Sequence, residues 1–537
     1  MMAEIEKNEA SMPVAASAPN SVDESEPAVV TLKTWVVALI LSCGYDLSFW
    51  PVPVVSAIGS SLSADMGDTG GYIWFVPTWT ISTTCSFLLF GPNTDLFGRR
   101  WFLVLGNLVT FAGHIIVATA KNSNQIIAGL VVTGFSGANC QIAVIVAPVT
   151  ARFGYEMNHW VWNFWGPAIF QVLSFVGLLL LYHPPKHPLG FSYMEAFKSM
   201  DYLGAFLFIG GVVPFLLGIV WANVYSSTDP HVVASLVAGA VVLVCFALWE
   251  TFGNLKYPLA PTAIFTSSYG RDFTAPVIAL GVINMFYYSS SILWPEMIDA
   301  FYTNFDADWR YAVVLSLPQG FGILLGALLL TFLGSYIRNW QWQLTGFVFV
   351  MVLFGSLLGL VLPHNKGMMI AFLFLSQVGF GWGIYLSIAL CQMGVTQQNL
   401  GVSGGISGCL RFAAGAVATT IYEVVFDKSL TKYMDKYIPD AVTSAGLSES
   451  KVTGLMSVVS GGASALTSYS PAVASAAVKA LEHAYCKAIF IVAMVSMAFG
   501  IVGLIACLCC KDVDAKMTNR IEVYLENTKQ GERNTFH

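Results

Sequence analysis

Charged side chains inside long apolar stretches are the residues of this sequence best placed to do chemistry. Asp46 lies in "CGYDLSFWP" and Arg411 in "GCLRFAAG", whereas Glu250 and Glu423 lie near the ends of two other apolar stretches. A charged group at the centre of a bilayer costs about 2.5–3.5 kcal/mol, so it usually faces a cavity or a partner. We interpret Asp46 as a candidate for proton coupling, with a hydrogen bond to a neighbouring helix as the alternative. Arg411 either binds an anionic substrate group, pairs with an acid or braces two helices, and the two glutamates are expected to be interfacial.

Neutral polar side chains in the same apolar stretches form a second set of candidates. Each of them either lines a cavity or hydrogen-bonds a neighbouring helix. Together with an aromatic content of 14%, the set favours a bulky amphipathic organic ligand over an ion. The members are Asn139, Gln141, Asn163, Gln171, Asn284, Tyr287, Gln319, Gln377 and Gln392.

Enzymatic and metal sites are poorly supported by the sequence. His183 and His187 have a metal-like spacing, but Pro184 and Pro185 between them prevent the helix that would align the two rings. The sequence has no acidic metal cluster, Walker loop or cysteine-pair motif, and its net charge of −6 gives no sign of nucleic-acid binding. We therefore expect no enzyme activity, no catalytic residues, no metal and no cofactor.

The elements that would position these side chains are membrane-spanning helices. The chain has 537 residues, of which 56% are hydrophobic and 10% charged, whereas a soluble domain carries about 25% charged residues. A helix needs about 20 mostly apolar residues to cross the hydrocarbon. Thirteen runs qualify, at residues 34–59, 72–91, 101–120, 125–149, 160–182, 202–222, 232–251, 273–294, 311–334, 340–362, 368–391, 402–425 and 484–510.

The remaining segments lie outside these runs. Residues 1–33 are acidic and rich in Ser, Ala and Pro, which predicts a disordered cytoplasmic tail. Residues 426–483 are polar and rich in small residues, which predicts a long extramembrane loop with a short amphipathic helix near 472–483. Residues 511–537 are expected to form a second cytoplasmic tail.

The charge pattern conflicts with thirteen complete crossings. The positive-inside rule places Arg99, Arg100 and Lys186 on the cytoplasmic side. Three runs separate the arginines from Lys186, whereas a shared side needs an even number. Either a span is missing or one run does not fully cross. The segment 137–160 resembles the first part of one span joined directly to the last part of another. We hypothesise that one helix and a loop are absent near 142–145. Sequencing the transcript across this junction tests the idea.

A short charged motif lies between the second and third runs. The pattern G-x-x-x-D-x-x-G-R-R resembles the signature loop of the major facilitator superfamily, although Asn93 and Leu96 depart from the usual residues. Glycine permits a tight turn, and the resemblance implies that the cluster braces one half of the protein against the other as part of a conformational switch. The alternative is a pure topology anchor. The matching positions are Gly91, Asp95, Gly98, Arg99 and Arg100.

Most of residues 34–510 resembles the fourteen-span drug:proton antiporter branch. The chain looks most like the fungal trichothecene efflux pumps, with siderophore transporters as near neighbours. The resemblance rests on the stretches "GFSGANCQ", "WVWNFW", "RYAVVLSLPQGFG" and "LRFAAGAVATTIYE". Two features depart from the branch. Leu130 stands where an arginine is common, and only "APVTARFG" stands where an antiporter motif is expected.

The resemblance implies an all-α integral membrane protein with two helical bundles and two extra spans. We expect an incomplete N-terminal bundle at 34–182 (five helices instead of six), a linker with the extra pair at 183–271 and a C-terminal bundle at 272–510. About thirteen of the fourteen expected spans are present.

The expected function is proton-linked export of a fungal toxin, drug or secondary metabolite by alternating access. The chain would act as a monomer, with the lipid bilayer, a small amphipathic organic substrate and protons as its partners. It would lie in the plasma membrane or, alternatively, in a vacuolar or other internal membrane. Siderophore-iron uptake is one alternative function. An inactive shortened isoform, or a membrane sensor that transports nothing, is an alternative of another class.

Overall fold

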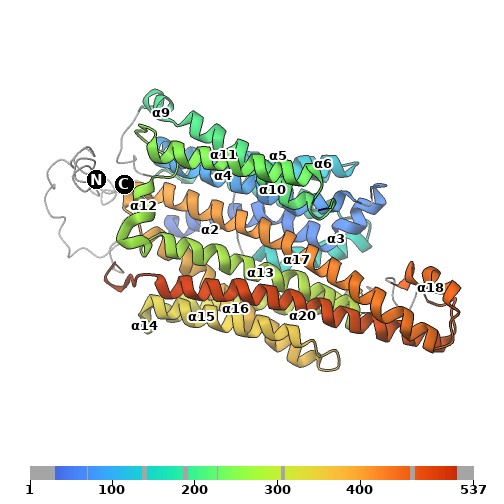
Figure 1. Ribbon diagram of the computed structural model, residues 1–537. Coiled ribbons are helices and arrows are strands. Elements are labelled where there is room, and N and C mark those ends of the chain that lie inside the picture. Colours follow the sequence, from blue (N-terminus) through green and yellow to red (C-terminus); the bar gives the residue numbers. More distant parts are fainter. Residues whose placement is uncertain are drawn as a thin grey trace.

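The computed structural model describes residues 31–68, 70–135, 142–184, 192–226, 228–303, 309–459 and 466–516. These residues contain helices and connecting turns but no β-strand. The long helices run roughly alongside one another (Figure 1). This arrangement suits a bilayer, because an α-helix satisfies its own backbone hydrogen bonds where no water is available.

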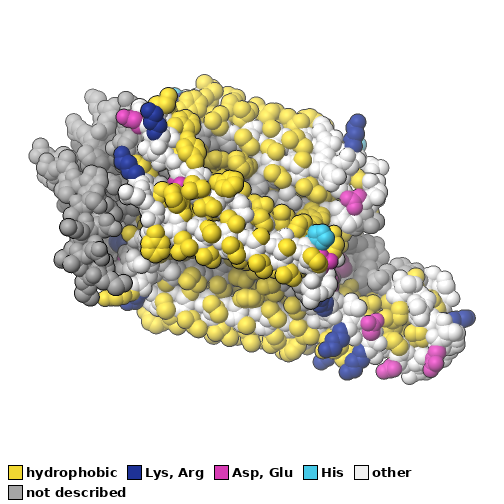
Figure 2. Space-filling model, turned by 45° about the horizontal axis from the view of Figure 1, so that its top comes forward, with side chains coloured by type: hydrophobic (Ala, Val, Ile, Leu, Met, Phe, Trp, Pro, Cys, Tyr) yellow, Lys and Arg dark blue, Asp and Glu magenta, His cyan; other side chains and the backbone are white. Residues whose placement is uncertain are grey.

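Twelve helical segments in the described part of the chain are long and apolar enough to cross a membrane. Hydrophobic side chains cover the middle of the visible face, and charged side chains gather toward its two ends (Figure 2). The spanning segments are α2–α3 (Leu32–Asp65), η1–α4 (Gly71–Phe97), α5 (Arg99–Ala118), α8 (Trp162–Leu181), α10 (Tyr202–Trp221), α11 (Pro230–Phe252), α13 (Thr274–Phe301), α14 (Trp309–Ile337), α15–η3 (Trp340–Leu360), α16 (Lys366–Met393), α17 (Leu400–Ser444) and α20 (Pro471–Cys509).

The first span is broken near its middle by a proline. Helix α2 (Leu32–Phe49) ends two residues before Pro51, and α3 (Pro51–Asp65) begins at this proline. Proline has no N–H to donate and fits the first position of a helix. The Trp50 N–H still bonds the Asp46 carbonyl oxygen at 3.1 Å, so the chain continues in nearly the same direction.

The run at 125–149 is not a spanning helix, and that part of the prediction is wrong. It is divided between α6 (Ser123–Gly134, 12 residues) and α7 (Ile142–Glu156, 15 residues). At 1.5 Å per residue they extend about 18 and 22 Å, less than the roughly 30 Å of hydrocarbon.

The outer ends of α6 and α7 lie at the same end of the molecule. The Ser123 hydroxyl oxygen of α6 lies 3.2 Å from that of Ser63, and the Tyr155 hydroxyl of α7 donates to Asp65 at 2.6 Å. Both partners belong to the last turn of α3. The α6–α7 pair therefore enters the bundle and returns to the face from which it came.

This geometry removes the conflict in the charge pattern. Two complete helices, α5 and α8, remain between Arg100 and the segment that follows α8. The Arg100 guanidinium donates to the Leu179 carbonyl oxygen at 3.2 Å and lies 3.0 Å from His183 Nε2. The start of α5 and the end of α8 therefore share one end of the molecule, as the positive-inside rule requires. Lys186 itself lies outside the described residues.

The segment 426–483 is largely helical rather than a long loop. Helix α17 continues without a break to Ser444, α18 covers Glu449–Met456, and α20 already begins at Pro471. The short helix expected near 472–483 is thus the first part of α20. Buried residues such as Ile438, Val442, Leu455 and Val473 form one apolar cluster. They hold these helical ends together as the protrusion at the right of Figure 1.

The first residues after α20 pack onto the C-terminal bundle. The Lys511 amine lies 3.4 Å from Asp272, the Trp340 N–H donates to Asp512 at 3.0 Å, and the Lys516 amine donates to the Met393 carbonyl oxygen at 2.7 Å. Burial alone would raise the pKa of Asp272, but bonds from nearby serines and the Lys511 charge hold this pKa below its usual value. The expected tail beyond 516 lies outside the described residues.

Candidate functional site

The signature loop joins the two bundles directly. Asp95, 3% exposed near the end of α4, accepts the Gly401 N–H at 3.0 Å and the Val402 N–H at 3.1 Å. Both donors belong to the first turn of α17, where backbone N–H groups have no partner inside the helix. Arg99 lies 3.9 Å from the same carboxylate. Gly98 takes a φ of 83°, a left-handed conformation that glycine adopts without strain.

Helices α4 and α17 cross at very short range next to this loop. A Cβ atom added at Gly91 would lie 2.4 Å from Gly405 Cα and 2.6 Å from the Gly401 carbonyl oxygen. Only glycine allows the two backbones to approach this closely. The signature end of the molecule is therefore closed by a backbone crossing that Asp95 reinforces.

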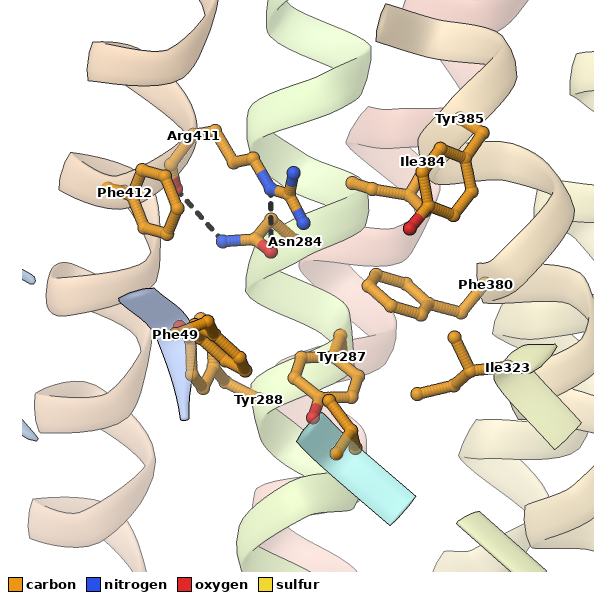
Figure 3. A pocket seen from close by; sticks show the side chains of 11 residues that line it. Phe49, Asn284, Tyr287, Tyr288, Ile323, Phe380, Ile384, Tyr385, Arg411 and Phe412 are labelled. Atoms are coloured by element: carbon orange, nitrogen blue, oxygen red, sulfur yellow. Dashed lines mark hydrogen bonds between the residues drawn. The ribbon is translucent and has the colours of Figure 1, made fainter. Parts of the chain in front are cut away.

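A small cavity lies between the bundles, farther along α17. Its volume is about 30 Å³, enough for water but not for an organic molecule. Phe49 of α2 and Val144 of α7 contribute one wall, and residues of α13, α14, α16 and α17 contribute the rest (Figure 3). The lining residues are Phe49, Val144, Asn284, Tyr287, Tyr288, Ile323, Phe380, Ile384, Tyr385, Arg411 and Phe412.

Arg411 and Asn284 form the polar pair of this cavity. The Asn284 amide nitrogen donates to the Arg411 carbonyl oxygen at 2.9 Å, and Arg411 Nε donates to Asn284 Oδ1 at 3.4 Å. Arg411 is 8% exposed and Asn284 3% exposed. The terminal guanidinium nitrogens extend beyond Asn284 toward the side of the cavity formed by α16 (Figure 3). Within the described residues Arg411 has no acidic partner, so of the three interpretations of this residue, pairing with an acid is wrong.

The other neutral candidates do not converge on this cavity. Gln171 donates to Asn107 at 2.7 Å and Gln377 donates to Ser290 at 2.7 Å, each joining two helices within one bundle. Asn163 donates to the carbonyl oxygens of Thr150 and Trp160, both at 3.2 Å. Gln319 is half-buried and Gln392 is exposed, and neither lines the cavity. Asn139 and Gln141 lie outside the described residues.

Asp46 lies at the inner end of α7 rather than in the cavity. Its carboxylate accepts the Ala143 N–H at 3.0 Å. Ala143 is the second residue of α7, so Asp46 satisfies a backbone donor of a helix that begins inside the bundle. The alternative interpretation, a hydrogen bond to a neighbouring helix, describes this contact.

The two glutamates expected to be interfacial are engaged in contacts. Glu250, in the last turn of α11, is 7% exposed and accepts the N–H groups of Leu259 at 3.4 Å and Ala260 at 3.0 Å, so it is bonded to the segment that follows the helix and not solvated. Glu423 is partly buried and accepts from the Asn223 amide at 2.9 Å, which links α17 to the turn after α10.

A second, wider pocket lies within the N-terminal bundle. It has a volume of about 410 Å³ and is lined by residues of α2, α7 and α8 and of the segments next to them, including Trp50, His159, Trp162 and Asn163. Trp162 is 62% exposed, so the pocket opens on a side of the bundle. Asn163 is the predicted cavity residue that lies here.

Sequence reasoning missed the aromatic walls of the central cavity. Tyr287 was a candidate, but Tyr288, Phe380 and Tyr385 were not. Phe412 directly follows Arg411 in the chain, and Tyr288 lies one helical turn after Asn284. An aromatic residue beside a buried polar residue was therefore the available signal.

Comparison with known proteins decides the family. The family model described as fungal trichothecene efflux pump (TRI12) matches residues 49–147 and 139–537. The chain belongs to this family. It is a multi-pass membrane transporter of the major facilitator type, which confirms the resemblance of the signature loop.

Individual relatives agree with the family. MFS-type transporter prx5 of Penicillium rubens is 66% identical over 526 residues, covering 93% of this chain and 95% of the relative. Trichothecene efflux pump TRI12 of Fusarium sporotrichioides is 24% identical, over 88% of this chain and 85% of the relative. The crystal structure of the POT family transporter PepTSo matches with a TM-score of 0.51 at 12% identity, over 89% of this chain and 99% of that chain. This last likeness concerns the fold alone.

The family matches also bear on the α6–α7 junction. The two matched ranges overlap at 139–147, which includes the start of α7. The alignment with the Penicillium rubens relative spans 526 positions but takes in only 93% of these 537 residues. The relative therefore carries residues within the aligned region that this chain lacks.

Proposed function

We propose that this protein exports a small amphipathic organic compound by alternating access, coupled to protons. The observation that carries the proposal is the position of the central cavity, whose walls come from both bundles. A site shared in this way opens when the bundles tilt apart at one end and closes when they return. Experiment must identify the exported compound as a toxin, a drug or a secondary metabolite.

The signature end supports the closed half of this cycle. Asp95 bonds the first turn of α17, and Gly91 lies against Gly405. The cavity is too small for an organic molecule, so a substrate enters only after the bundles separate. Gly91, Asp95, Gly98, Arg99 and Arg100 would then form the switch that releases and restores this closure.

Asp46 is our proposal for the proton-coupling residue. It accepts the Ala143 N–H, and α7 also contacts α14 of the other bundle where Ile145 lies against Gly320. A movement of α7 with α14 would lengthen the bond to Ala143 and expose the carboxylate to water and protons. The charge of Asp46 would thus be linked to the relative position of the bundles.

Two further assignments, the membrane and the oligomeric state, are also proposals. A toxin exporter is useful at the plasma membrane, where export leaves the cell, and a vacuolar membrane is the alternative. One chain contributes both bundles and the whole cavity, which suits a monomer.

Reconstitution tests the proposed function. The purified full chain is placed in liposomes with an imposed pH gradient, and release of a labelled trichothecene is compared with that from empty liposomes. We expect release that depends on the gradient and that stops when an ionophore removes it. In parallel, expression in a toxin-sensitive yeast should raise tolerance. Growth rescue on iron-siderophore medium without raised tolerance would favour uptake instead.

A second candidate function is an inactive shortened isoform, and the half-length helices α6 and α7 favour it. Such a protein would insert correctly yet move no compound. Cytoplasmic location of tags on both ends of the chain, together with no gradient-driven release, would favour the inactive isoform over the exporter.

A further inference from the structure

Arg411 is a buried cation whose side chain is only partly satisfied. It is 8% exposed, and its side chain has one polar hydrogen-bond partner in the described residues, the Asn284 oxygen at 3.4 Å from Nε. A guanidinium carries five N–H donors in a planar fork. Asn284 fixes the base of this fork, and the terminal nitrogens remain turned toward the cavity (Figure 3).

The neighbouring helices offer no carboxylate to neutralise this charge. On α17 the next acidic residue is Glu423, and on α13 the first after Asn284 is Glu296. Each lies twelve positions away, which is about 18 Å along a helix. In the N-terminal bundle, Asp46 precedes the cavity residue Phe49 by three positions. Its carboxylate accepts the Ala143 N–H of α7. A buried charge without an opposite partner is costly, so a bound anion would be stabilised here.

Flat aromatic rings surround the cation. Tyr287 stacks on Phe380 with ring centres 4.5 Å apart and an angle of 18° between the planes. Phe412 and Tyr288 complete the walls on the side of α17 and α13. Such walls bind a planar apolar body, whereas a fork of N–H donors recognises a carboxylate or sulfonate through paired hydrogen bonds.

We propose that the central cavity selects organic anions, with Arg411 binding the acidic group and the aromatic walls holding a planar body. The inference rests on the proposed function, because it names the substrate class of the same cavity. Val144 and Phe49 close the cavity from the other bundle, so the anion would be enclosed when the bundles come together.

The test uses two compounds of equal shape and different charge. Naphthalene-2-sulfonate is a permanent anion, and naphthalene-2-sulfonamide is neutral at pH 7. Equilibrium dialysis measures the binding of each to the purified full chain in detergent. We expect the sulfonate to bind about tenfold more tightly, the scale of a charge-assisted hydrogen-bond pair.

Three variants locate the effect. Arg411→Gln should remove the preference for the sulfonate while leaving sulfonamide binding within twofold. Arg411→Lys keeps the charge but loses the planar fork, so it should retain only part of the preference. Arg338→Gln removes an exposed arginine at the end of α14 and should change nothing. Monodisperse elution of each variant controls for folding.

Several outcomes would overturn the inference. Equal binding of both compounds by the unaltered chain, a preference that survives in Arg411→Gln, or binding of neither compound would each exclude an anion site at Arg411. If gradient-driven release of a trichothecene persists in such a case, the proposed export stands and only the substrate class is wrong. If that release is also absent, the proposed function fails as well.

Discussion

Corresponding helices of the two bundles differ in length. In the C-terminal bundle, the helices that follow α15 are α16 and α17, with 28 and 45 residues. In the N-terminal bundle, the helices that follow α5 are α6 and α7, with only 12 and 15 residues. Both C-terminal helices are long enough to cross a membrane, whereas neither N-terminal helix is.

Helices of both pairs show how the unpaired N–H groups at a helix N-terminus are satisfied. The first N–H groups of α17 lie at the signature end, and Asp95 accepts two of them. The first N–H groups of α7 lie near the middle of the bundle, and Asp46 accepts the one from Ala143. In both places a carboxylate of the N-terminal bundle satisfies a helix N-terminus, which also favours negative charge.

The largest effect is expected from lengthening the short helices α6 and α7. Replacing residues 137–145 with a longer apolar segment, so that α6 and α7 each reach the roughly 20 residues that a crossing needs, should extend both helices across the membrane. Each unsatisfied backbone group in hydrocarbon costs several kcal/mol, so the gain in stability should be of that order. Thermal unfolding in detergent measures the stability, and a yeast assay measures export. The unfolding temperature and the export rate should both rise.

The same comparison needs a control for added length alone. A segment of equal length composed of Gly and Ser, inserted at the same place, should give no gain. If the longer apolar segment lowers both stability and export, the short helices α6 and α7 are a functional feature of this chain and not the mark of a missing span.

The next largest effect concerns the crossing of α4 and α17. Gly405→Ala would place a Cβ atom 2.7 Å from the Phe87 carbonyl oxygen and 3.1 Å from Gly91 Cα. The backbones would have to separate, at a cost of about 1–3 kcal/mol. Gly404→Ala is the matched control, because a Cβ atom there meets nothing within 4 Å.

Export rate and thermal unfolding report the result. We expect Gly405→Ala to lose most export and Gly404→Ala to keep it. Equal behaviour of the two alanine variants would mean that the closely packed crossing has no role in closing the signature end.

A smaller effect is expected at Asp46. Asp46→Ala removes the acceptor of the Ala143 N–H and should destabilise the protein by about 1–3 kcal/mol. Asp46→Asn keeps an acceptor oxygen and should restore most of the stability, but it cannot carry a proton. The pair of variants therefore separates support of α7 from proton coupling.

The readouts are thermal unfolding and release from liposomes with and without a pH gradient. If Asp46 couples protons, Asp46→Asn should unfold like the unaltered chain and release substrate without dependence on the gradient. A gradient dependence that persists in Asp46→Asn would assign coupling to another residue and leave Asp46 with the structural role alone.

Much of this fold was predictable because hydrophobic runs and positive charges report local properties. Twelve of the thirteen predicted runs correspond to spanning segments in the described part of the chain, and the signature loop turns at Gly98 as expected. The break at Pro51 was less visible, because apolar residues lie on both sides of it. Charge parity indicated that a span was missing or that one of the three runs between Arg100 and Lys186 did not fully cross, and the suspected segment, 137–160, overlaps the run that does not cross.

The site was predictable only in part. Arg411, Asn284 and Tyr287 meet at one cavity, whereas Gln171 and Gln377 bond their neighbours within a bundle. A polar residue in an apolar run has the same local sequence in either case. Which side of a helix faces the other bundle depends on packing between segments far apart in the chain, and a single sequence does not contain that information in local form.

The smallest expected effects compare one glutamine in each bundle. Gln171 donates to Asn107 and Gln377 donates to Ser290, both at 2.7 Å and both buried. Hydrogen bonds between membrane helices contribute about 0.6 kcal/mol on average. Double-mutant cycles with Gln171→Leu and Asn107→Leu, and with Gln377→Leu and Ser290→Ala, should each give a coupling energy near this value.

The difference between the two cycles is informative about the incomplete bundle. Gln171 and Asn107 join α8 to α5, the two complete helices on either side of the α6–α7 pair. If the half-length helices leave this bundle able to adjust, the broken pair finds new partners there, and its coupling energy falls below that of Gln377 and Ser290. Chemical unfolding in detergent measures both cycles. A larger coupling energy for Gln171 and Asn107 would contradict this expectation. It would mean that the shortened bundle depends more on its remaining contacts and that the short helices make their neighbours more rigid.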